Sequence, residues 1–169
     1  MTGVAIIGLL AWSGGAHIDT PLAPPVGITH CSANRRFCAV ADPQRDAVAI
    51  YRVEGGDDRR TELWAITPWQ RVFDLANDGD HLVVCYSGQN LLPLHYKQDW
   101  PMLEFYERHK VVRRWSLGEL VPDLRKLRRT VSHYEWGNCL GFDSAGRYQV
   151  RTVDRGLLRF DASTGKLTE

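Results

Sequence analysis

The chain has 169 residues, 44% of them hydrophobic, and a formal net charge of +1. This length and composition are typical of one globular domain, so we treat residues 1–169 as a single domain. The near-zero net charge argues against a nucleic-acid partner. No apolar run reaches the ~20 residues that cross a bilayer, so we expect no membrane partner either.

The N-terminal residues 3–12, GVAIIGLLAW, are apolar and precede the small residues SGGA. Their length and the small residues after them are typical of a secretory signal. However, a signal normally has a Lys or Arg before its apolar segment, and none precedes these residues. We therefore expect a buried strand here, with a signal segment as the alternative.

Four cysteines allow three disulfide pairings. Cys31 and Cys38 flank one short turn, so the two sulfur atoms face each other if the flanking residues form a hairpin. We expect Cys31–Cys38 together with Cys85–Cys139, which would indicate an oxidising compartment. Four buried free thiols are the alternative. The spacing does not fit a zinc site.

Three similar turns lead into apolar strands: SANRRFCAV, ANDGDHLVV and DSAGRYQV. They start at residues 32, 76 and 143, which are 44 and 67 positions apart. A period in the low forties is typical of a β-propeller blade. Further strands and hairpins are expected from β-branched and aromatic runs that end at Gly, Asn or Asp turns. These segments are residues 47–53, 61–67, 71–86, 102–115, 147–153 and 156–167.

One segment, residues 119–131, has helical spacing, with Leu120, Leu124, Leu127 and Val131 on one face. We expect one short amphipathic helix there. It would account for most of the excess length of the second interval between turns.

The segments FCAVAD, AVAIYRV and LLRFDASTGKL resemble the strands of bacterial β-propeller blades, over residues 28–169. The resemblance implies an all-β, antiparallel and incomplete propeller-like arrangement of about three to four small blades. Three blades do not close a ring, so we expect the N-terminal strand, the helix and the loops to cover the exposed ends. A chance repeat within a β-sandwich is the alternative.

No catalytic motif is present. The six histidines are scattered, and Cys85 lies in an apolar run where a thiol is unreactive. The NDGD turn lacks the later Glu of a calcium loop, and Gly-x-Ser-x-Gly is absent. The basic stretches KVVRR and RKLRR are interpreted as solvated faces. We expect no enzymatic activity, metal or cofactor.

The most distinctive segment is the loop at residues 87–100, SGQNLLPLHYKQDW, which is too long for a hairpin turn. Long loops in compact domains are commonly functional. A polar tip on an apolar stem would suit a segment that enters a cleft. In the alternative, the leucines pack back onto the sheet and only the tip is exposed. The residues expected to bind a partner are Ser87, Gly88, Gln89, Asn90, Leu91 and Tyr96.

The segment HLVVCYSGQN and the overall layout resemble periplasmic immunity proteins that bacteria pair with type VI secretion amidase effectors. The resemblance implies a periplasmic inhibitor whose partner is a papain-like cysteine amidase acting on peptidoglycan. It also implies that Ser87, with its three neighbours, enters the groove of that enzyme.

Two other functions stay open: a periplasmic binding or scaffold module without inhibitory role, and an enzyme. If the loop is not the contact, the next candidates are Trp69, Trp115 and Trp136.

Overall fold

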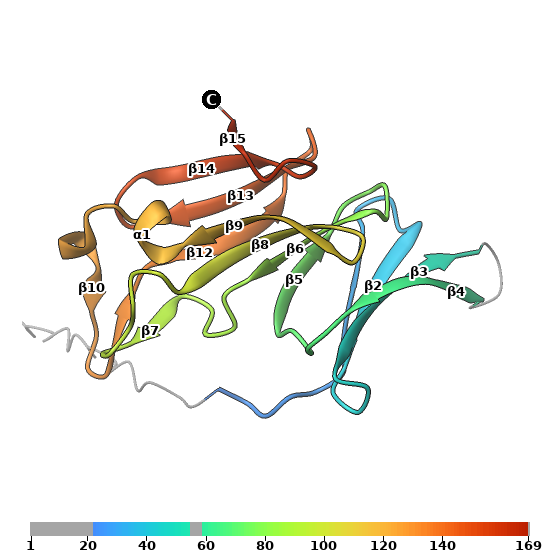
Figure 1. Ribbon diagram of the computed structural model, residues 1–169, viewed down its shortest axis with the longest axis horizontal. Coiled ribbons are helices and arrows are strands. Elements are labelled where there is room, and N and C mark those ends of the chain that lie inside the picture. The colour runs from blue at the N-terminus through green and yellow to red at the C-terminus, as the bar shows by residue number, and fades with distance from the viewer. Residues whose placement is uncertain (1–21, 55–58, 169) are drawn as a thin grey trace, which may run out of the picture.

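A computed structural model describes residues 22–54 and 59–168, and it is all-β with one short α-helix (Figure 1). The strand expected at residues 3–12 lies outside these residues. The described strands form four small antiparallel sheets. Sheet A contains β1 (Ile28–Cys31), β2 (Phe37–Asp42), β3 (Ala47–Val53) and β4 (Arg60–Ile66). Sheet B contains β5 (Val72–Leu75), β6 (His81–Cys85), β8 (Pro101–Glu107) and β9 (Lys110–Ser116). Sheet C contains β7 (Leu91–Pro93), β10 (Arg128–Arg129) and β11 (His133–Glu135). Sheet D contains β12 (Gly137–Phe142), β13 (Arg147–Thr152), β14 (Gly156–Asp161) and β15 (Leu167–Thr168).

Sheets A, B and D are four-stranded meanders in which neighbouring strands follow one another along the chain, apart from the excursion through β7. The expected all-β class and the expected hairpins are therefore confirmed. Strand β13 alternates between its two faces, because Tyr148, Val150 and Thr152 are buried and the residues between them are not. The described residues form no closed ring of sheets.

Sheet B lies between sheets A and D (Figure 1), and its inner strand β6 is buried on both faces. Strand β6 shows this by its alternation, since successive side chains of a strand point to opposite faces. Leu82 and Val84 pack in a cluster with Phe37, Ile50 and other side chains of sheet A. Val83 and Cys85 pack in a second cluster with side chains of sheets C and D. The stacking order of these three sheets thus follows the chain.

The three repeated turns each join the first strand of a four-stranded sheet to the second, which confirms their predicted role. In the first turn, the amide of Ser32 donates to the carbonyl of Phe37 at 2.9 Å. The amides of Ala76 and Asp143 make the corresponding bonds in the other two turns. Asn34 of the first turn also donates to the backbone carbonyl of Asn77 of the second at 2.8 Å, so neighbouring turns touch.

The prediction of one helix over residues 119–131 is wrong. The structure has α1 (Leu117–Leu120), then the 3-10 turn η1 (Leu124–Lys126), then β10. Pro122 explains the break, because it lacks an N–H group and disfavours a helical conformation in the residue before it. Leu120 and Leu127 are still buried, whereas Val131 is 85% exposed.

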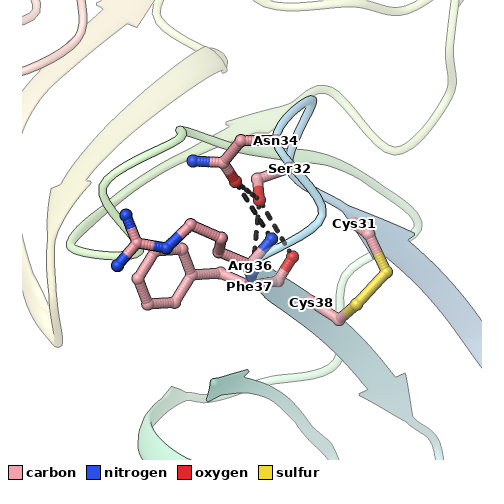
Figure 2. The surroundings of a disulfide bond; sticks show 6 residues. All are labelled: Cys31, Ser32, Asn34, Arg36, Phe37 and Cys38. Atoms are coloured by element: carbon pink, nitrogen blue, oxygen red, sulfur yellow. Dashed lines mark hydrogen bonds between the residues drawn. A yellow bond between two sulfur atoms is a disulfide. The ribbon is translucent and has the colours of Figure 1, made fainter. Parts of the chain in front are cut away.

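Both expected disulfides are present, and no cysteine is free. Cys31 and Cys38 lie directly opposite each other on β1 and β2. Figure 2 shows this bridge beside Ser32, whose hydroxyl donates to the Asn34 side chain at 2.7 Å and so fixes the turn. Cys85 and Cys139 join sheet B to sheet D.

Candidate binding site

The loop between β6 and β8 begins with a tight turn that forms its tip. The amide of Gln89 donates to the carbonyl of Tyr86 at 3.0 Å, and Gln89 has a φ of 60°. Ser87, Gln89 and Asn90 are exposed. Gly88 has no room for a side chain, because a Cβ atom there would lie 2.4 Å from the Tyr86 ring. The tip is therefore polar, accessible and restricted in conformation.

The stem of the loop packs against the body of the protein. Strand β7 pairs with β11, and Leu92 is fully buried. Tyr96 is half-buried and meets the Tyr134 ring edge-on, with ring centroids 5.4 Å apart. Leu91 is also half-buried, and Leu94 is exposed. Leu92 thus packs back onto the protein, as the alternative interpretation predicted. The exposed polar part of the predicted site is the tip.

Trp136 anchors the tip from inside. Its side chain is fully buried in the cluster between sheets B and D. The indole Nε1–H donates to the carbonyl of Gln89 at 2.7 Å, and its backbone amide donates to the carbonyl of Asn90 at 3.2 Å. The expectation that Trp136 is a surface contact is therefore wrong. Trp69 and Trp115 are both half-buried.

Two cavities lie along the first strands of sheets A, B and D. One, of about 840 Å³, is bordered by the tip residues Gln89 and Asn90. The other, of about 690 Å³, is lined by residues of all three repeated turns, including Ala33, Asn77 and Asp143. Ser87 borders a third hollow of about 470 Å³. The tip therefore borders two of these hollows, the first through Gln89 and Asn90 and the third through Ser87.

The second cavity contains Asp74, a carboxylate at the junction of sheets B and D. Burial raises the pKa of Asp74, and the hydroxyl of Tyr148, which donates to it at 2.9 Å, partly offsets this effect. Burial and the Asp74 charge in turn raise the pKa of Tyr148 well above its ordinary value. The pair fixes the packing of β13 against β5 through a polar contact.

Several reactive groups are accounted for by structural contacts. All four cysteines are disulfide-bonded, so none offers a thiolate nucleophile. Within residues 22–54 and 59–168, no three His, Cys, Asp or Glu side chains are grouped to hold a metal ion.

In the same part of the chain, no helix is long and apolar enough to cross a bilayer.

Neither the family models nor the curated proteins searched give a match to this chain. The site thus rests on its own geometry. Sequence reasoning predicted an exposed polar tip here but missed its Trp136 anchor and the adjoining cavity. The lone Trp in YEWGN gave no sign that its indole would reach a loop 47 residues away.

Proposed function

We propose that this protein is an extracytoplasmic inhibitor that blocks a partner enzyme by inserting the tip, Ser87 to Asn90, into its cleft. The observation that carries the proposal is an exposed polar tip held from below by the buried Trp136. A tip that is already ordered loses little conformational entropy on binding, which favours tight inhibition. The protein itself acts without enzymatic activity or cofactor.

The proposed partner is a secreted papain-like cysteine amidase that cuts peptidoglycan, as the resemblance to immunity proteins of type VI secretion implies. The Ser87 hydroxyl would meet the catalytic Cys and His of that enzyme. Two disulfides support an oxidising location, here the periplasm. Stacking of sheets A, B and D in chain order supports an incomplete, propeller-like arrangement in which each of these sheets is one small blade.

The deciding experiment measures inhibition of the amidase by Ser87→Ala and Ser87→Arg. The first leaves a buried polar group of the partner unpaired, at about 1–3 kcal/mol, so the inhibition constant should rise at least severalfold. The second should cost more, because a long charged side chain does not fit a groove shaped for Ser. Melting temperatures should stay level, because the Ser87 side chain is exposed.

Ser144→Arg is the matched control, since Ser144 is an exposed turn residue between β12 and β13, in another sheet. It should inhibit as well as the wild type. Full inhibition by Ser87→Arg would exclude the tip as the inserted segment.

A binding or scaffold module is the second candidate, favoured by the size of the cavity beside the tip, about 840 Å³. If this is the function, the protein would bind its partner without changing the hydrolysis of peptidoglycan fragments by any amidase from the same bacterium.

A further inference from the structure

The cavity of about 840 Å³ lies where the first strands of sheets A, B and D meet. Within the described residues, β1, β5 and β12 each pair with one neighbour only, so each leaves one edge unpaired. Apolar groups, among them Val72, Val153 and the Cys85–Cys139 bridge, form part of the lining. A lining of this kind lowers the local dielectric constant and strengthens any charge interaction at the rim.

The charged lining of this cavity is mainly basic. Arg71, Arg128 and Arg151 line it, and Glu135 is the one carboxylate there among the described residues. Glu135 lies directly opposite Arg128 in the register of β11 and β10, so it offsets that charge. The Arg151 side chain is exposed and forms no ion pair or hydrogen bond with another described residue.

Arg71 is held in place at the rim. Its guanidinium lies over the Trp69 ring, 5.2 Å from the centroid, and donates to the carbonyl of Ala23 at 2.5 Å. No carboxylate among the described residues pairs with it. A fixed guanidinium with donors to spare is well suited to a carboxylate, which it can bind through two parallel hydrogen bonds.

We propose that this cavity binds a short acidic peptide segment of a protein partner. Arg71 and Arg151 pair with its carboxylates, and the amides of Asn90 and Asn138, which also line the cavity, hydrogen-bond to its backbone. The volume is that of a pocket for a small ligand or a few residues of peptide. Charge complementarity selects an acidic segment over a neutral one. This site goes beyond the inhibitory tip, because it would serve any partner with such a segment.

The test uses isothermal titration calorimetry with an acetylated, amidated heptapeptide of alternating Gly and Glu, and its counterpart with Gln for Glu. The wild type should bind the Glu peptide at low salt and more weakly at high salt. Binding of the Gln peptide should be at least tenfold weaker. Equal binding of both peptides, or no binding of the Glu peptide, would overturn the proposal.

Variants locate the binding. Arg151→Glu should weaken binding of the Glu peptide at least tenfold. If this charge reversal lowers the melting temperature, Arg151→Gln takes its place, and it should weaken binding by a smaller factor because it only removes the charge. Arg52→Glu is the control, because Arg52 is an exposed strand residue outside the cavity with the same change in net charge. Equal loss in both reversals would indicate net charge alone and contradict the proposal.

Two further arms separate related explanations. Displacement of the peptide by 10-fold excess inorganic phosphate would identify a simple anion site and overturn peptide recognition. Ser87→Arg should bind the Glu peptide like the wild type, because Ser87 borders a different hollow. This arm separates the cavity from Ser87, whereas Asn90 belongs to both the tip and the cavity.

Discussion

The residues at one position of the repeated turns look equivalent in the sequence but differ in the atoms that surround them. Arg35, Gly79 and Gly146 all have a positive φ, between 57° and 77°. Only at Gly79 would an added Cβ collide with a packed group, since it would lie 2.4 Å from the Phe37 ring. At Gly146 nothing lies within 4 Å of that position.

We therefore expect Gly146→Ala to cost about 1–2 kcal/mol, the penalty for a left-handed conformation. Gly79→Ala should cost about 1–3 kcal/mol more, because the Phe37 ring must move within the cluster between sheets A and B. Urea unfolding of the two variants measures the difference. Equal costs would mean that the Phe37 ring gives way freely.

Asp74 provides a pH-dependent test at the residue scale. Burial raises its folded-state pKa above the ordinary 3.8, so the folded protein keeps this proton to a higher pH than the unfolded chain does. The stability that the neutral carboxyl supplies is complete below the ordinary pKa. It is lost as the pH rises through the folded-state pKa.

Asp74→Asn cannot ionise and still offers an oxygen to the Tyr148 hydroxyl. The melting temperature of the variant relative to wild type should therefore increase as the pH rises above the ordinary pKa of an aspartate, about 4, and level off once the folded carboxyl has ionised. Thermal unfolding of both proteins across this range measures the difference. A difference that stays constant with pH would show that Asp74 is ionised in the folded protein throughout.

Among the elements, hairpins could be predicted from sequence because their turns and strands are local. The helix failed for a local reason as well: the spacing of Leu120, Leu124 and Leu127 suggested one helix, but Pro122 divides the segment. The anchor of the loop could not be predicted, because it depends on a contact between Trp136, the residue after β11, and Gln89 in a turn 47 positions earlier.

The anchor leads to a prediction for the loop. Trp136→Phe removes the Nε1–H donor to the Gln89 carbonyl, a loss of about 1 kcal/mol. Amide hydrogen exchange at Gln89 and Leu91 should become severalfold faster, and inhibition of the proposed partner should weaken. Trp115→Phe is the control, because it removes the matching bond to the Gly165 carbonyl elsewhere. Unchanged exchange at the tip would show that the loop orders itself.

In the whole molecule, the number of sheets could be estimated from the spacing of the turns, but the cavity could not. Arg71, Arg128 and Arg151 come from sheets B, C and D or their borders, and only the stacking of these sheets brings them together. Periodicity within a strand shows which residues share a face. It does not show which sheets become neighbours.

The two disulfides should differ in their contribution to global stability. Cys85–Cys139 closes a loop of 54 residues and Cys31–Cys38 a loop of 7. Chain-entropy estimates give about 4 kcal/mol for the first and about 2.5 kcal/mol for the second. Cys85→Ala with Cys139→Ala should therefore destabilise more than Cys31→Ala with Cys38→Ala in urea unfolding. The reverse order would show that the short bridge stabilises chiefly through the native hairpin.

The placement of these bridges also orders events during synthesis, because a chain emerges from its N-terminus. Cys31 and Cys38 lie on adjacent strands and can join as soon as one hairpin exists. Cys85 must wait until Cys139 emerges with sheet D. If the first hairpin has closed its bridge by then, Cys85 and Cys139 have no competing thiol within the chain. The sequential layout of the sheets would in that case disfavour mispaired cysteines.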